Sequence, residues 1–384
     1  MKTQYRFTYL ALLAVGLMFF GIACDSAGDN EEPLDPMDPP PVETFDRAGM
    51  LDNVANNIIL PAYAAFQEST DALQAAVAAF AGDPTAATLV PAQDALKATR
   101  MAWQEVSMFQ FGPAESVALR GVLNTYPTNT TQINDNIVAG SYTLGSIQNI
   151  AAGGFPAMDY LLHGEGLTPD EIVAQFTSDA DASARVQYLT DNVDFVKSNT
   201  DFVVQQWAAN GGNYVGTFLS EDNGGTDVGS SLGQLINAVV LHFERFTRDG
   251  KIGIPAGVRS AGVPRPKATE AFYAGYSVEL AKANLESIGR LFSGVTAAGQ
   301  DGLGLEDNLD FIEQGALADD IVTTLQESIT AIEGLSDPLK AQIDDDVNKV
   351  VATFTKMQEL VVLLKVDMTS FLGISITYQD TDGD

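Results

Sequence analysis

Two side chains capable of acid–base or metal chemistry lie four residues apart in the stretch GGFPAMDYLLHGEG, residues 153–166. Asp159 and His163 would share one face of a helix, where a carboxylate and an imidazole can pair or supply two ligands to a metal. His163 precedes Gly164, and a cationic or hydrogen-bonding residue is common at a helix C-terminus. The stretch is therefore either a helix with a paired carboxylate or part of a metal site.

Other metal ligands of the zinc type are scarce. The chain has two histidines, His163 and His242, and a single cysteine, Cys24. A catalytic zinc site normally needs about three protein ligands and a general base. His242 lies in an amphipathic segment with charged neighbours and is interpreted as a helix-packing residue. Oxygen ligands for hard cations such as Fe³⁺ or Ca²⁺ are plentiful, so iron or another divalent or trivalent metal is the cofactor to consider, with Asp159 and His163 as candidate ligands.

The net charge of the chain restricts the binding partners that can be expected. The chain has 20 basic and 51 acidic residues, a formal net charge of −31. No nucleic-acid partner is expected, because nucleic acids require basic surfaces. Cations or cationic ligands are electrostatically favoured, although an acidic surface can serve solubility alone. Five basic residues fall between Arg248 and Lys267, where Gly and Pro predict a loop. This basic stretch is predicted either to pair with acidic faces or to border an anion-accepting site.

Helical periodicity dominates from residue 45 onward. One series of apolar residues at helical spacing comprises Leu232, Leu235, Ile236, Val239, Val240, Phe243 and Phe246. Stretches with strand alternation are short, so the pattern predicts an all-α protein built of helical bundles. The Gly-rich residues 210–233 are the predicted boundary between an N-terminal bundle at 45–212 and a C-terminal bundle at 213–384.

Local signals predict two features of individual helices. Thr168, Pro169 and Glu171 form a capping box with proline at the first helical position, so a helix is expected to begin there. Pro61, inside the apolar run NNIILPAYAAFQ, is expected to kink a long first helix rather than to end it.

The N-terminus resembles that of an exported lipoprotein. Lys2 and Arg6 precede a short apolar run, and residues 1–23 are predicted to be a signal peptide. Small residues before Cys24 predict lipidation of this cysteine; ordinary cleavage nearby, leaving a free thiol, is the alternative. Residues 24–44 are acidic and Pro-rich, which predicts a tether. The protein is thus expected in the cell envelope, anchored through Cys24 to a membrane, on the periplasmic or surface face of the outer membrane.

Five dispersed blocks resemble the imelysin family of bacterial envelope proteins, most closely its lipoprotein branch from Bacteroidetes-type bacteria. They are ATRMAWQEVSMFQFGPAES, LNTYPTNTTQINDNI, GGFPAMDYLL, RDGKIGIPAGVRSAGVPRPKATEAFYAGYS and FLGISITYQDTDGD. The resemblance implies two helical bundles packed side by side, with a cleft where they meet. It also implies either a role in iron acquisition, with an iron-containing ligand or an uptake receptor as partner, or the peptidase activity under which the family is classified.

The family motif Gly-x-His-x-x-Glu falls on Gly154, Pro156 and Asp159. Proline has no ligand atom in its side chain, so half of a His/Glu metal pair is missing, while Asp159 keeps a carboxylate. An enzyme is therefore not favoured. The resemblance places a candidate cleft at Gly154, Pro156, Asp159, Tyr160, Arg100, Trp103 and Lys251. Within it, Arg100 is expected either to bind an anionic ligand or to pair with Asp159.

Three functions follow from these observations. The first is an envelope lipoprotein that binds a ligand in iron or metal uptake. The alternatives are a metallopeptidase of the same family and a non-catalytic surface interaction protein.

Overall fold

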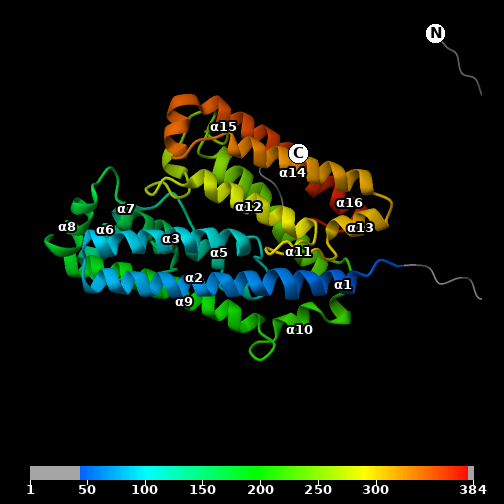
Figure 1. Ribbon diagram of the computed structural model, residues 1–384, viewed down its shortest axis with the longest axis horizontal. Coiled ribbons are helices and arrows are strands. Elements are labelled where there is room, and N and C mark those ends of the chain that lie inside the picture. Colours follow the sequence, from blue (N-terminus) through cyan, green and yellow to red (C-terminus); the bar gives the residue numbers. More distant parts are fainter. Residues whose placement is uncertain (1–43, 379–384) are drawn as a thin grey trace, which may run out of the picture. The chain divides into compact units, whose positions relative to one another are not determined.

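The computed structural model describes residues 44–378, and every regular element in that part of the chain is helical (Figure 1). The prediction of an all-α protein is confirmed. The label η marks 3₁₀- and π-helical segments. In chain order the elements are α1 (Arg47–Asp52), η1 (Asn53–Ile59), α2 (Leu60–Gly82), α3 (Ala86–Val106), α4 (Pro113–Ser116), α5 (Leu119–Leu123), α6 (Thr130–Ala139), η2 (Ile147–Asn149), α7 (Gly154–His163), α8 (Pro169–Thr177), α9 (Ala182–Trp207), α10 (Tyr214–Phe218), η3 (Glu221–Asn223), α11 (Ser231–Leu241), η4 (His242–Gly253), η5 (Pro266–Ala268), α12 (Ser277–Phe292), α13 (Leu305–Phe311), α14 (Gly315–Glu333), α15 (Leu339–Val362), η6 (Leu363–Met368) and α16 (Thr369–Leu372).

The first long helix continues through Pro61. Asn53 and Leu60, at the two junctions of α1, η1 and α2, both have right-handed helical dihedral angles. A proline cannot donate a hydrogen bond to the preceding turn, and its ring crowds that turn's carbonyl. The wider π-helical turns of η1 lie directly before Pro61 and accommodate both effects. The prediction that Pro61 does not end the helix is confirmed. The helix has π-helical geometry just before the proline.

A first group of helices consists of α2, α3 and α9, with α7 packed against α3 and α9 (Figure 1). Buried aromatic rings fill its core. Phe66 of α2 lies 5.6 Å from Trp103 of α3 and 6.3 Å from Phe155 of α7, measured between ring centroids. Aromatic pairs at such distances contribute more than their buried area alone. This packing fixes α3 relative to α7, the two helices that carry Arg100 and Asp159.

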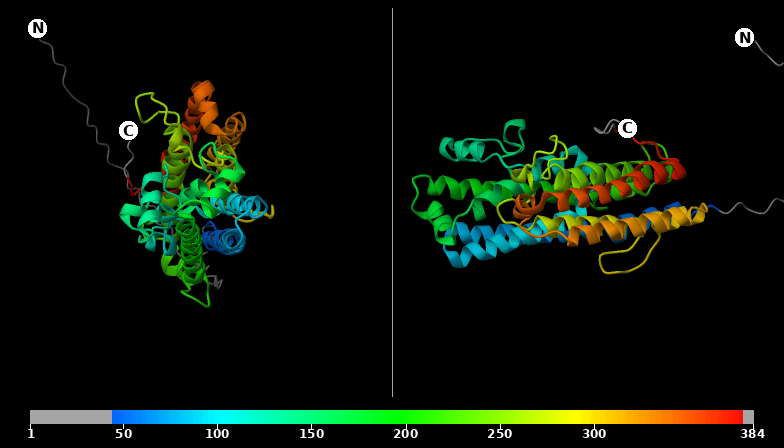
Figure 2. Two further views of the ribbon diagram at one scale, coloured as in Figure 1. Left: turned by 90° about the vertical axis from the view of Figure 1, so that its left-hand side faces the viewer. Right: turned by 90° about the horizontal axis from the view of Figure 1, so that it is seen from above.

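A second group contains α12, α14 and α15, with η4 packed against α12 and α15. In the right-hand view of Figure 2, the red end of the chain with α15 runs alongside the green-yellow segment that contains η4. The helix α12 also packs against α3, and the buried apolar side chains of both groups belong to one continuous cluster. Residues 45–378 belong to one compact unit. Its division into two bundles at residues 210–233 stays a prediction.

The basic stretch begins as a helix, so the predicted loop is wrong for residues 248–253. Arg248 and Lys251 lie in η4 and are buried, and Gly- and Pro-rich turns follow only after Gly253. Packing against α12 and α15 outweighs the weak helix propensity of the two glycines in this segment. The predicted pairing with acidic side chains is confirmed for Lys251 with Glu270 and for Arg259 with Asp249, the latter at 2.9 Å.

The predicted helix start at Thr168 is also confirmed. The Thr168 hydroxyl accepts a hydrogen bond from the backbone N–H of Glu171, and the Glu171 carboxylate accepts one from the backbone N–H of Thr168. This reciprocal capping satisfies two donors at the start of α8.

Several predictions lie outside the described residues. They concern the signal peptide, Cys24 and most of the tether, in residues 1–43. Within residues 44–378, no helix is long and apolar enough to cross a membrane.

Candidate functional site

The start of α7 depends on a glycine. Gly154 has a positive φ of 65°, and a Cβ at this position would lie 2.2 Å from the carbonyl oxygen of Leu123. Its N–H donates to Oδ1 of Asn192 at 2.9 Å. Pro156 follows in the first turn, where no helical N–H is needed. The motif's glycine and proline therefore set the direction of α7 and take no part in ligand chemistry themselves.

Asp159 is buried, and both of its oxygens are occupied. Oδ2 accepts a hydrogen bond from the backbone N–H of Tyr273 at 3.0 Å, and Oδ1 accepts one from Ala274 at 3.1 Å. The guanidinium of Arg100 lies 3.6 Å from Oδ1, so the pairing of Arg100 with Asp159 is present. Only 1% of Asp159 is exposed. The carboxylate thus ties α7 and α3 to the segment after η5.

A metal centre does not fit at this position. Nδ1 of His163 is 3.5 Å from Oδ1 of Asp159, and burial lowers the pKa of His163. The pair could offer a metal at most one nitrogen and a carboxylate that already has three partners. Across residues 44–378, no group of three His, Cys, Asp or Glu side chains is arranged to hold a metal ion. The residues present do not form the metal site that the family motif implies.

A second buried carboxylate, Glu270, links Arg100 to Lys251. Glu270 pairs with Lys251, lies 3.9 Å from Arg100 and accepts a hydrogen bond from Nδ2 of Asn124 at 2.8 Å. Lys251 also donates to Oε1 of Gln104 at 2.8 Å. Burial by itself would raise the pKa of Glu270, but the charges of Lys251 and Arg100 outweigh burial, and the pKa lies below its ordinary value. Two cations and two carboxylates therefore balance one another in the interior.

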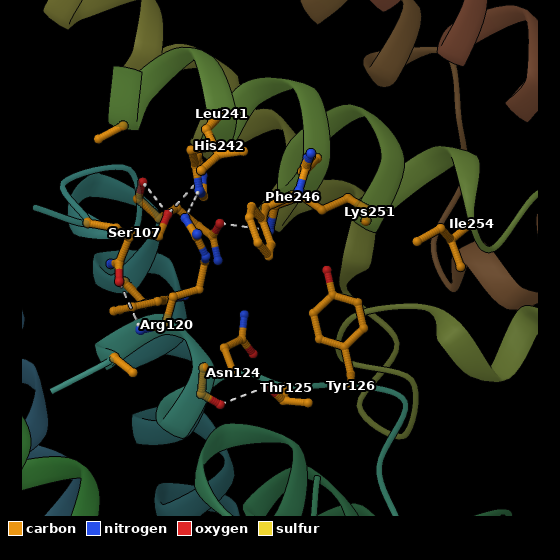
Figure 3. Close-up of a pocket in the computed structure, with 18 of the residues that line it drawn as sticks. Ser107, Arg120, Asn124, Thr125, Tyr126, Leu241, His242, Phe246, Lys251 and Ile254 are labelled. Atoms are coloured by element: carbon orange, nitrogen blue, oxygen red, sulfur yellow. Dashed lines mark hydrogen bonds between the residues drawn. The ribbon is translucent and has the colours of Figure 1, made fainter. Parts of the chain in front are cut away.

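A pocket of about 610 Å³ opens beside this network. One wall comes from the end of α3 and from α5 with the turn after it, and the other comes from α11 and η4 (Figure 3). Trp103, Gln104 and Lys251 belong to its lining, as do Asn124 and Tyr126. Its volume is that of a small-molecule site, and such pockets commonly lie where two helical groups meet.

His242 forms part of the pocket wall in a defined neutral state. Arg120 can only donate, so Nδ1 of His242, 3.4 Å from its Nη1, is the acceptor. Nε2 then carries the proton, and Oδ1 of Asn284 and Oγ of Ser107, both at 3.2 Å, are its acceptors. Burial, Arg120 and Lys251 hold the pKa of His242 well below its ordinary value. The helix-packing interpretation of His242 missed its position in the pocket.

Arg120 provides the pocket's other notable group. Its guanidinium lies over the ring of Phe246, 3.4 Å from the ring centroid, and Figure 3 shows it extending toward His242. Burial lowers the pKa of Arg120 to about 10, so the side chain stays cationic at neutral pH. Among residues 44–378, no carboxylate lies within ion-pair distance of this guanidinium.

The structure gathers some of the predicted cleft residues and separates others. Trp103 and Lys251 line the pocket, while Arg100 and Asp159 lie in the buried network. Tyr160 is not among the lining residues and contacts Asn134 and the ring of Tyr273. The sequence pattern did not single out Glu270, Arg120, Asn124, Tyr126 or the pocket position of His242. Glu270 falls in a family-like block, which was the available signal for it.

The fold and the pocket define a class of protein, and comparison with known proteins identifies the family. The class is an all-α protein with a buried charge network and a pocket between helical groups. The chain belongs to the imelysin family, whose sequence profile, Imelysin, matches residues 59–364.

Individual relatives agree with this assignment. The chain is 29% identical over 77 residues to Iron-regulated protein A of Synechococcus elongatus. This alignment spans 20% of this chain and only 22% of that protein. A crystal structure from Parabacteroides distasonis, of a protein proposed to be an iron-regulated protein A precursor, shares the fold with a TM-score of 0.69 at 19% identity, covering 88% of this chain and 98% of that one. An imelysin-like protein from Psychrobacter arcticum has a TM-score of 0.64 at 18% identity, covering 86% and 97%.

Proposed function

We propose that this imelysin-family protein binds a small ligand in the pocket between α3/α5 and α11/η4, as a component of iron uptake. The observation that carries the proposal is the pocket itself. It measures about 610 Å³ and is lined by fixed polar groups on an apolar frame, the usual composition of a ligand site. Lys251 and His242 are positioned by buried hydrogen bonds before any ligand arrives.

The link to iron rests on the relatives. Two of the matching proteins are named for regulation by iron, and such names concern those proteins. Carried over to this chain, they make an iron-containing compound the first ligand to test. An uptake receptor in the envelope is the corresponding protein partner.

The proposed location follows from the N-terminal sequence. Lipidation at Cys24 would anchor the protein to a membrane of the cell envelope, and the acidic Pro-rich residues up to 44 would separate the folded part from that membrane. Labelling cells with a fatty-acid analogue tests this location. Label should appear on the wild-type protein and be absent from Cys24→Ala.

A metallopeptidase is the competing proposal, and two observations weigh against it. Pro156 has no ligand atom, and Asp159 is shielded from solvent by Arg100 and two backbone donors. A general base for water activation must reach the water it deprotonates, and the buried Asp159 has no free oxygen with which to do so.

The binding proposal is tested by thermal unfolding in the presence of ferric citrate, haem or Fe²⁺. A ligand that binds the folded state raises the melting temperature. The variant Ala238→Leu adds bulk to the pocket wall and should reduce the rise. Ala78→Leu makes the same change on an exposed part of α2 and should leave the rise intact.

Two outcomes would favour the alternatives. Cleavage of casein that requires added Zn²⁺, is stopped by EDTA and is lost in Asp159→Ala while that variant keeps its helical circular dichroism would establish the peptidase. If no compound shifts the melting temperature and no cleavage occurs, a non-catalytic surface interaction protein becomes the better description.

A further inference from the structure

Within a strongly acidic chain, the pocket presents a cation that has no carboxylate partner among residues 44–378. Arg120 lies on α5 with its guanidinium between the ring of Phe246 and the imidazole of His242. Because His242 is neutral, with its Nε2 proton directed to Asn284 and Ser107, it gives Arg120 no opposite charge. The positive charge at this end of the pocket is therefore not compensated by any carboxylate of the described residues.

Other hydrogen-bond donors surround the same space. Nε2 of Gln110 is buried without a partner among the described residues, while its Oε1 accepts from the backbone N–H of Arg120. The hydroxyl of Tyr126 points into the pocket toward Lys251 in Figure 3. Burial raises the pKa of Tyr126 well above its ordinary value, so this hydroxyl keeps its proton and can donate. A guanidinium, an amide and a phenol in the lining of one cavity suit an oxyanion.

The same pocket lining is poorly suited to binding a bare metal cation. The buried carboxylates of the adjacent network, Glu270 and Asp159, already pair with Lys251 and Arg100. Glu115 lines the pocket but is exposed. A hard cation needs several oxygen ligands within one shell, and these side chains do not offer them.

We infer that the pocket recognises its ligand through an anionic oxygen group, a carboxylate or a phosphate, held by Arg120. This rests on the proposed ligand-binding function and narrows it: iron would enter as an anionic chelate and not as a free ion. The chelate's own oxygens would contact Arg120, Gln110 and Tyr126, while the metal stays within the chelator.

The two histidines make this inference measurable at a single position. With ¹³C,¹⁵N-labelled histidine, the protein gives ring signals from His163 and His242 only, and His242→Gln assigns them. Citrate, inorganic phosphate and gallium citrate, the diamagnetic counterpart of ferric citrate, are titrated separately at constant ionic strength. Zn²⁺ is the cationic probe and glucose the neutral probe. We expect saturable movement of the His242 signals with at least one anion, and unchanged His163 signals.

Variants at Arg120 test whether the guanidinium carries the recognition. Arg120→Gln should weaken anion binding by about 10- to 100-fold, the range expected for a hydrogen bond to a charged group. Arg120→Lys keeps the charge without the planar fork and should fall between wild type and Arg120→Gln. Arg265→Gln removes the same charge from an exposed side chain outside the pocket lining and should bind like wild type. The wild-type titrations remain decisive even if a variant does not fold.

The outcomes separate this inference from the function on which it rests. Anion binding that depends on Arg120 supports both. If only Zn²⁺ or glucose moves the His242 signals, or if anions bind Arg120→Gln as well as wild type, the anion inference is wrong and ligand binding in the pocket stands. If no anion, cation or neutral probe moves these signals and no iron compound raises the melting temperature, both are wrong.

Discussion

Asp159 shows how a single position of the family motif can keep its charge without keeping a metal. Its carboxylate is neutralised by Arg100 and by two backbone N–H groups, and Pro156 stands at the position of the motif's histidine. The possible Arg100–Asp159 pair could be named from sequence because both residues fall in family-like blocks. Arg120 lies outside these blocks, so it could not be named. Glu270 falls in a block, but its partners are set by tertiary contacts: it accepts from Asn124, a residue 146 positions away.

Removing the charge of Asp159 should destabilise the protein. Asp159→Asn would leave Arg100 buried with only Glu270, at 3.9 Å, as a counter-charge. Breaking a buried pair on one side typically costs about 3–5 kcal/mol, so the free energy of unfolding in urea should fall by about 3 kcal/mol. Asp71→Asn, which removes an exposed partner of Lys197, should cost less than about 1 kcal/mol. Equal losses in the two variants would contradict this account.

His242 should make stability depend on pH. In the unfolded chain its pKa returns to the ordinary 6.5, whereas burial and nearby cations lower it in the folded protein. Below pH 6.5 the unfolded chain therefore binds more protons, and the unfolding free energy falls with decreasing pH by up to about 1.4 kcal/mol per unit until the folded pKa is reached. Above about pH 7 this contribution is constant.

Urea unfolding at about pH 7.5 and about pH 5.5 measures this slope. His242→Gln should flatten it more than His163→Gln does, because Asp159 favours the protonated form of His163 and opposes the effect of burial there. A wild-type slope that His242→Gln leaves unchanged would show that other groups control the acid response.

Among the elements, α7 and η4 mark the limits of prediction from sequence. The helix boundaries at Thr168 and Gly164 follow from capping chemistry, which depends on local residues and can be recognised in the sequence. The helical course of η4 through Gly250 and Gly253 cannot be predicted from the sequence, because packing against α12 and α15 determines it. Gly154, which begins α7, falls in the motif block. The reason that glycine is needed there, the proximity of Leu123, is visible only in the structure.

Substitution by alanine should therefore destabilise the protein to different extents at two glycines with similar backbone angles. At Gly154 (φ 65°) an added Cβ would lie 2.2 Å from the Leu123 carbonyl oxygen, whereas at Gly140 (φ 63°) it would have nothing within 4 Å. Gly140→Ala should cost about 1 kcal/mol, for the left-handed backbone alone. Gly154→Ala should cost about 3 kcal/mol or more, because the clash adds to the same backbone cost. Urea unfolding of both variants gives the comparison, and similar losses would argue against the clash.

At the scale of the whole described unit, the two helical groups are joined by buried polar contacts as well as by the apolar core. Nδ2 of Asn284 on α12 donates to the carbonyl of Gln104 and to Ser107, both at 3.1 Å. Arg290 also makes two partly buried contacts with Glu105, at 2.5 and 2.6 Å. Buried hydrogen bonds between the groups cost free energy when one group separates, because each leaves an unsatisfied partner.

The unit should consequently unfold in one step. Both tryptophans, Trp103 and Trp207, lie before residue 213, so their fluorescence reports the first helical group, while far-UV circular dichroism reports all helices. The two signals should give coincident urea transitions. Separate transitions would mean that the groups are independently stable, as expected for two autonomous domains.

The uncompensated Arg120 also has a kinetic consequence in a chain whose formal net charge is −31. An anion on its way to the pocket must first cross a repulsive long-range field, and only near Arg120 does attraction take over. Salt screens the long-range part more than the short-range part, because the Debye length falls from about 30 Å at 0.01 M to about 10 Å at 0.1 M. Stopped-flow measurements should therefore find that added salt accelerates the entry of anions such as citrate, the opposite of the usual steering of oppositely charged partners.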